Sequence, residues 1–338
     1  TWLSVAYVAY SVCYLAHLSW GAALSSDYHA RSRIFGWWQA GTLLGSIVVL
    51  ATPILAEGAL HRSHEVGVQA MGWLVAGLLP VTVSLAVLGV AEPAGAARQA
   101  LARPIDYLKL MARPTIARLL VADLMIGTAI GMNSSLFFFY FGFIKQTPLL
   151  EVTVLLFLNL CGSLCGTPLW SWLTGRIGKH RAAAWAFFFY AVSLLVIAWT
   201  PLGVAMARIV LFLAGLTLSA GPLLLRSMMA DAGDEERLLT GQDRTGLISA
   251  LFSGTNKLGL ALAPGITFLG LGLAGFQAGG ANSAKALGAL QGLYVFAPAA
   301  LGFVTAWLIR GHALTAERHA QILKELEQDH RQPLSQNI

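Results

Sequence analysis

The sequence predicts an all-α protein, a polytopic transmembrane helical bundle with about nine spans. Hydrophobic residues make up 57% of the chain and charged residues 11%, whereas an average soluble domain carries roughly 25% charged residues. The 35 glycines and 12 prolines are distributed among the apolar runs, which is typical of membrane helices because neighbouring helices tolerate both residues. This composition disfavours a soluble enzyme, and the net charge of +6 does not indicate a nucleic-acid partner.

Apolar runs long enough to cross a bilayer, which takes about 20 residues, follow one another along the chain. They cover residues 1 to 25, 34 to 56, 67 to 91, 117 to 143, 149 to 173, 182 to 200, 202 to 228, 246 to 276 and 286 to 309. The longest connection, 92 to 116, contains Pro104, which suits the first turn of a short helix on the membrane surface. After the last span, the segment from Thr315 to Asp329 predicts a solvated helix with a narrow apolar stripe.

The basic residues alternate between connections, and this orients the spans. Of the 22 lysines and arginines, 17 lie in every second connection or in the tail: Arg31, Arg33, Arg98, Arg103, Lys109, Arg113, Arg118, Arg176, Lys179, Arg181, Arg226, Arg237, Arg244, Arg310, Arg318, Lys324 and Arg331. Basic residues concentrate in cytoplasmic loops, so this side and the C-terminus are predicted to be cytoplasmic, in a bacterial inner membrane. An odd number of spans then places Thr1 outside, and we expect an odd number of helices to be missing before it.

Lys257 lies inside the eighth predicted span. Counted from Gly246 at about 1.5 Å per residue, its ammonium is about 17 Å deep, near the bilayer midplane. A lysine at this depth costs at least about 2.5 kcal/mol. It therefore indicates either a charged group that faces a water-filled pathway or a structural ion pair that locks two helices.

Three further polar groups occur inside predicted spans. Asp123 could pair with Lys257, although helical rise places the two about 8 Å apart in depth, and a structural role is the alternative. His17 could carry a proton or act as a neutral hydrogen-bond partner. Trp20 and the amides of Asn133, Asn159 and Asn256 could line a sugar-binding cavity, or the amides could link helices.

Small residues at helical spacing predict close helix packing. They form the GxxxG pairs Gly41 with Gly45, Gly127 with Gly131, and Gly162 with Gly166. Cys161 and Cys165 have a metal-like spacing but no His or carboxylate beside them, so no metal site is expected.

Several segments resemble one family of transporters. Gly175 to Arg181, with the sequence GRIGKHR, resembles the loop motif of the major facilitator superfamily. The stretches Met229 to Glu236, Thr240 to Gly246 and Asn256 to Gly259 resemble the signature of the glycoside-pentoside-hexuronide:cation symporters, the melibiose-permease-like family. Further similarity lies in Trp20 to Leu24 with Asp27 to Arg31, and in Glu317 to His319.

The resemblance implies a twelve-helix carrier, of which this chain would lack about the first three helices. Residues 1–91 would then be a partial N-terminal half with helices four to six, and 92–116 a cytoplasmic linker with an interfacial helix. Residues 117–310 would be the C-terminal six-helix half, and 311–338 the cytoplasmic tail.

The same resemblance implies site residues. Lys257 falls on the family's functional lysine and Trp20 on an aromatic position near the sugar, while Asp231, Asp234 and Arg244, with Arg176 and Arg181 of the loop motif, would form a cytoplasmic gate. Two positions depart from the family: Ala16, beside His17, replaces an aspartate, and Gln39 stands where sugar-transporting members can carry an arginine.

We therefore expect a secondary active transporter, not an enzyme, that couples Na+ or H+ to the symport of a sugar, glycoside or related small solute by alternating access. Its partners would be that solute and membrane lipid, with no nucleic acid, no cofactor beyond the coupling ion, and a monomeric state. The alternatives are a lipid or drug carrier of the same superfamily and a membrane-embedded transferase.

Overall fold

The computed structural model describes residues 5, 8–10, 12, 13, 16, 17, 20, 24, 28–90, 104–199, 203–242, 244–312, 314 and 316–331. These residues are helical apart from short turns, and no strand occurs among them, so the all-α prediction is confirmed. The chain divides into two compact units, Thr1–Leu101 and Ala102–Ile338, here called unit 1 and unit 2.

Eight helical segments of the described residues are long and apolar enough to span a membrane. They are Gly41–Gly58, His64–Gly89, Pro114–Ile144, Leu149–Ile177, Lys179–Trp199, Val204–Thr240, Thr245–Leu273 and Ala284–Arg310. They match the second to the ninth predicted spans, while most of the first, 1 to 25, lies outside the described residues.

Unit 1 contains the helices α2 (Tyr28–Gly58) and α3 (His64–Gly89), which pack against each other. A Cβ added at Gly67 would lie 3.0 Å from the Cα of Pro53, so the absence of a side chain lets the two helices approach. At the turn between them, the imidazole Nδ1 of His64 lies 2.5 Å from the Oε1 of Glu57. Among the described residues, nothing lies within 4 Å of a Cβ built at Gly41 or Gly45, so the close packing of this pair stays a prediction.

Unit 2 contains the remaining helices, several of which include one turn of π-helix. In chain order they are α4 (Pro104–Met111), α5 (Pro114–Phe139), η1 (Tyr140–Ile144), α6 (Leu149–Ile177), α7 (Lys179–Trp199), α8 (Val204–Leu218), η2 (Gly221–Leu225), α9 (Arg226–Thr240), α10 (Thr245–Leu273), α11 (Ala284–Gln291), η3 (Gly292–Phe296), α12 (Ala297–Arg310) and α13 (Ala316–Arg331). The expected short helix does begin at Pro104, and the tail is helical from Ala316, with Thr315 outside the described residues.

The helices of unit 2 pack mainly in three pairs, α5 with α10, α6 with α8, and α7 with α12. Glycines make the first two contacts possible. A Cβ at Gly259 of α10 would lie 2.9 Å from the carbonyl oxygen of Leu124, and one at Gly162 or Gly166 would overlap the backbone of α8. The predicted close packing is therefore confirmed for Gly162 with Gly166, and Gly131 likewise lies against Ala263 of α10.

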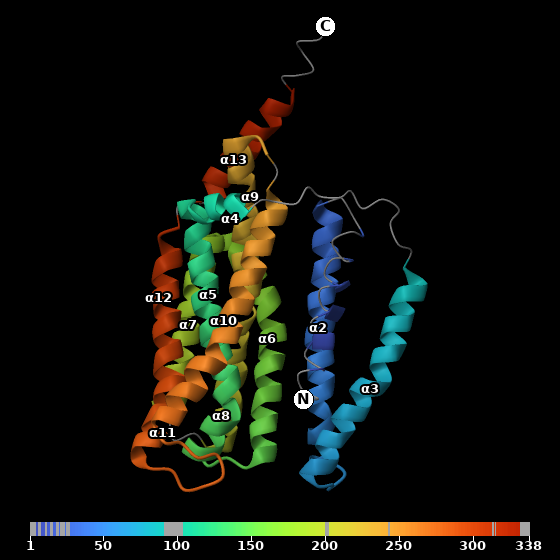
Figure 1. Cartoon of the computed structure of the whole chain (residues 1–338), viewed down its shortest axis with the longest axis vertical. Coiled ribbons are helices and arrows are strands. Elements are labelled where there is room, and N and C mark those ends of the chain that lie inside the picture. The colour runs from blue at the N-terminus through green and yellow to red at the C-terminus, as the bar shows by residue number, and fades with distance from the viewer. Residues whose placement is uncertain are drawn as a thin grey trace. The chain divides into compact units, whose positions relative to one another are not determined.

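The seventh predicted span ends too early. Residues 229 to 240 continue the helix as α9, which stops at Gly241, a glycine with a φ of 67°. The helix continues because Met229, Ala232 and Glu236 repeat at helical spacing on a buried face. The acidic residues between Asp231 and Glu236 therefore lie on a helix. This part of α9 projects beyond the apolar core together with α4 and α13 (Figure 1). We call this end of unit 2 the charged end.

Candidate functional site

A polar cluster lies where α5 crosses α10. Asp123 is 2% exposed, and its carboxylate accepts hydrogen bonds from the hydroxyl of Thr255 at 3.0 Å and the amide Nδ2 of Asn256 at 3.4 Å. The two helices approach closely here because Gly259, one turn after Thr255, presents no side chain to α5. A buried carboxylate that keeps two hydrogen-bond donors from another helix ties the two helices together.

Lys257 follows this cluster directly on α10. Its side chain is exposed on the surface of unit 2, as is that of Leu258, while Gly259 is buried against α5. The expected depth offset of about 8 Å between Asp123 and Lys257 is too large, because Asp123 reaches Thr255 and Asn256. The start of α5 at Pro114, three residues before the predicted start, accounts for about half of this offset at about 1.5 Å per residue. The structure thus places Asp123, Asn256 and Lys257 at nearly one level.

The predicted site residues of unit 1 are described only in part. His17 is exposed, and its ring centroid lies 6.0 Å from those of both Trp20 and Trp38. Gln39 lies on α2, with its side chain outside the described part of the chain. His17 and Trp20 are therefore neighbours, as one site would require.

The two other candidate asparagines link helices. The amide of Asn133 donates to the carbonyl of Tyr294 at 2.6 Å, and its oxygen accepts from the hydroxyl of Tyr190. Asn159 donates to the carbonyl of Leu211 at 2.9 Å. Both asparagines line a cavity of about 200 Å³ inside the bundle, below the roughly 300–1,000 Å³ of ligand pockets. For Asn159, these contacts favour the helix-linking alternative over a role in the substrate pathway.

In the part of the chain that the structure describes, two sets of ion pairs join different helices at the charged end, and the first surrounds Glu236. This carboxylate is 2% exposed and lies 3.0 Å from the Nε of Arg113 and 3.3 Å from the Nη1 of Arg244. Arg244 also donates to the amide oxygen of Gln242 at 2.9 Å. Glu236 thereby connects the chain entering α5, the helix α9 and the chain entering α10.

The second set lies on the other face of α9. The ammonium of Lys179 donates to both oxygens of Asp231, at 2.6 and 2.7 Å, and the Nε2 of His319 lies 2.9 Å from Asp234 and 3.6 Å from Asp231. The contacts join the N-terminus of α7, α9 and the tail helix α13. Asp231, Asp234 and Arg244 of the predicted gate thus lie in ion pairs that connect helices.

The other two predicted gate residues are placed differently. The guanidinium of Arg176 lies 4.6 Å from the ring centroid of Trp172 on the same helix, and Arg181 is exposed. Several partners in these contacts were not predicted from the sequence: Glu236, Lys179, Thr255, Arg113 and His319. For Glu236 a signal existed, since it repeats at helical spacing with the apolar Met229 and Ala232. Lys179 lies in the GRIGKHR motif, but the motif does not show which of its basic residues meets Asp231, and no sequence pattern singles out Thr255.

Comparison with known proteins agrees with this arrangement of membrane-spanning helices. A family described as "MFS/sugar transport protein" matches residues 1–315. The chain belongs to this family. Membership confirms the resemblance to the major facilitator superfamily and indicates a membrane transporter rather than an enzyme.

Two curated relatives are similar to the chain. The glucuronide carrier protein homolog of Escherichia coli (strain K12) is 26% identical over 218 residues, which are 63% of this chain and 46% of that protein. An uncharacterised symporter, YjmB, of Bacillus subtilis (strain 168) is 21% identical over 329 residues, or 95% of this chain and 70% of the relative. The match to the carrier homolog thus spans less than half of its length.

Proposed function

We propose that the chain is part of a symporter that couples Na+ or H+ to the uptake of a sugar, glycoside or related small solute by alternating access. The observation that carries the proposal is Lys257, a charged residue exposed on a membrane-spanning helix directly beside the polar cluster at Asp123. Because a lysine at mid-membrane depth is costly in contact with lipid, its exposure fits a water-filled pathway.

An anionic glycoside fits this site best. The ammonium of Lys257 is a hydrogen-bond donor with a positive charge, the complement of a carboxylate. The similarity to a glucuronide carrier homolog points to the same class of substrate. His17, Trp20 and Gln39 of unit 1 would complete the pathway, where an indole face can stack on a sugar ring and an imidazole can carry a proton.

The charged end would face the cytoplasm of a bacterium and act as the gate. Arg113, Arg118, Lys179 and Arg244 lie at this end, and an excess of basic residues marks the cytoplasmic side of membrane proteins. The ion pairs of Asp231 and Glu236 join helices, so their exchange can accompany the rocking of the two halves. A monomer would suffice for this cycle.

The test is uptake into proteoliposomes that contain the full-length protein. A panel of labelled sugars, glycosides and glucuronides is offered under an imposed Na+ gradient, an imposed proton gradient, or neither. We expect one solute to accumulate above its outside concentration under one gradient only. If no solute accumulates under any gradient while a labelled lipid or a drug does, the symport proposal is wrong.

A further inference from the structure

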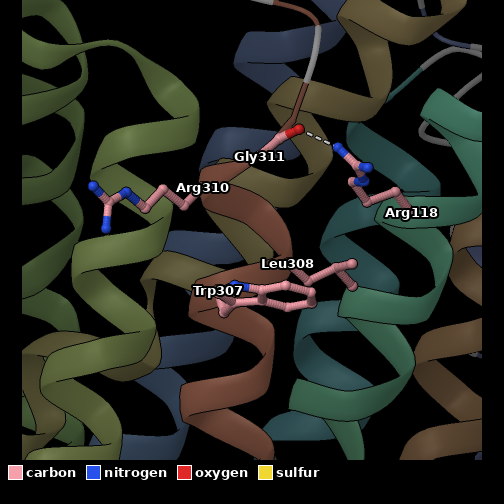
Figure 2. A pocket seen from close by; sticks show the side chains of 5 residues that line it. All are labelled: Arg118, Trp307, Leu308, Arg310 and Gly311. Carbon is pink, nitrogen blue, oxygen red and sulfur yellow. Dashed lines mark hydrogen bonds between the residues drawn. The ribbon is translucent and has the colours of Figure 1, made fainter.

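A pocket at the charged end of unit 2 combines arginine and tryptophan side chains (Figure 2). It lies between the first turns of α5 and the last turn of α12, and its volume is about 450 Å³. The residues that line it are Arg118, Trp307, Leu308, Arg310 and Gly311. None of them belongs to the polar cluster at Asp123 or to the ion pairs of the gate.

The two arginines of this pocket differ from those of the gate in their partners. Arg113 and Arg244 share the carboxylate of Glu236, whereas neither Arg118 nor Arg310 forms an ion pair with a carboxylate among the described residues. Arg118 donates to the carbonyl of Gly311, as the dashed line in Figure 2 shows. A guanidinium has five N–H groups, so Arg118 is held in place and keeps donors for a ligand.

The pocket lies at the boundary between membrane and water. Arg310 is the last residue of one membrane-spanning segment, and Arg118 lies in the first turns of another. Trp307, one turn before Arg310, is 76% exposed. Tryptophan is enriched at the level of the lipid headgroups, where its ring contacts the acyl boundary. The pocket therefore offers cations towards the water and an apolar surface towards the lipid.

We propose that this pocket binds the headgroup phosphate of an anionic phospholipid from the surrounding leaflet. Arginine binds phosphate through a planar fork of parallel N–H groups, and basic pockets between transmembrane helices on the cytoplasmic side bind anionic headgroups. Phosphate in solution would make no use of the exposed indole of Trp307. The competing interpretation is that Arg118 and Arg310 only neutralise the carbonyls at the C-terminus of α12.

The test compares lipid retention by the purified full chain. The protein is incubated with equal amounts of phosphatidylglycerol and phosphatidylcholine of the same acyl chains, and native mass spectrometry measures the ratio of the two bound lipids. We expect the unmodified chain to prefer phosphatidylglycerol. Arg118→Gln and Arg310→Gln should each lower the preference roughly fivefold, and the double variant roughly twentyfold, given the usual contribution of one basic residue near the membrane.

Matched variants separate the pocket from general charge. Lys109→Gln removes one exposed positive charge from α4 at the same end and should leave the preference unchanged. The double variant Arg118→Lys with Arg310→Lys keeps the charge but loses the fork, and should retain an intermediate preference. If Arg118→Gln does not fold because its bond to Gly311 is lost, Arg310→Gln alone carries the comparison.

Three results would overturn the proposal. The first is equal retention of the two lipids by the unmodified chain. The second is a loss of preference in Lys109→Gln as large as that in Arg310→Gln. The third is displacement of phosphatidylglycerol by excess inorganic phosphate, which would identify free phosphate as the ligand. Since none of the pocket residues belongs to the proposed transport pathway, failure here leaves the symport proposal untouched.

Discussion

In the middle of unit 2, neutral donors bind the buried carboxylate of Asp123, whereas at the charged end Glu236 and Asp231 are bound by cations. The difference reflects the free energy needed to place a charged group at each depth of the membrane. Ion pairs near water are cheap and can be numerous, while a charge at mid-membrane depth is expensive and is retained for a function. We infer that the ion pairs of the charged end hold helices of unit 2 together, as the proposed gate requires, and that the middle serves the transported solute.

The largest loss of stability is expected from Glu236→Gln. The carboxylate is 2% exposed, and its partners Arg113 and Arg244 have side chains that are 44% and 21% exposed. Breaking a fully buried pair costs about 3–5 kcal/mol, so with solvent screening of the arginines we expect about 2 kcal/mol. Thermal unfolding in detergent measures the loss.

Glu235→Gln is the matched control, because Glu235 lies beside Glu236 on α9 and is only partly buried. It should change the free energy of unfolding by less than about 0.5 kcal/mol. Equal losses in the two variants would show that Glu236 does not hold the charged end together.

A pH dependence of stability is expected from His312, a buried residue in the turn that follows α12. Burial, with a smaller contribution from the Arg118 charge, lowers the pKa of His312 to about 4, against 6.5 for the free side chain. The unfolded chain therefore binds a proton first as the pH falls. The stabilising contribution is present above the unfolded pKa and is lost progressively between pH 6.5 and 4.

Between about pH 6.5 and about pH 5 the lost stability should reach at most about 2 kcal/mol. Unfolding in denaturant at the two pH values, for the chain and for His312→Gln, measures it. The stability of His312→Gln should depend less on pH, because the variant lacks the titrating imidazole. Both ring nitrogens of His312 lack hydrogen-bond partners among the described residues, so the substitution breaks no side-chain hydrogen bond there. An unchanged profile would mean that other groups dominate acid unfolding.

The smallest effect on stability is expected at the polar cluster. Thr255→Val removes the 3.0 Å hydrogen bond to Asp123 and should cost about 1 kcal/mol. Thr128→Val on α5 is the control, because among the described residues the Thr128 hydroxyl donates to the carbonyl of Leu124 on its own helix and to no other group. Uptake should fall several-fold in Thr255→Val and remain near normal in Thr128→Val. Equal uptake in both would remove the cluster from the proposed pathway.

The sequence predicted the spans well because hydropathy alone fixes which segments can lie in a membrane. Lys257 could be found for the same reason, since a charge in an apolar run is conspicuous. Thr255 and Lys179 could not, because their roles depend on which helix surface meets Asp123 or Asp231. The helix in which Asp231 and Glu236 lie was also missed, since its amphipathic repeat begins within an apolar span and continues past it.

The most direct test of the account compares Lys257→Ala with the unmodified full-length protein. Gradient-driven uptake of the identified solute and thermal unfolding are measured on the same preparations. The account predicts that concentrative uptake is abolished while membrane insertion and the unfolding temperature stay close to those of the unmodified protein. Normal concentrative uptake by Lys257→Ala would contradict the proposed role of this lysine and with it the assignment of the transport pathway.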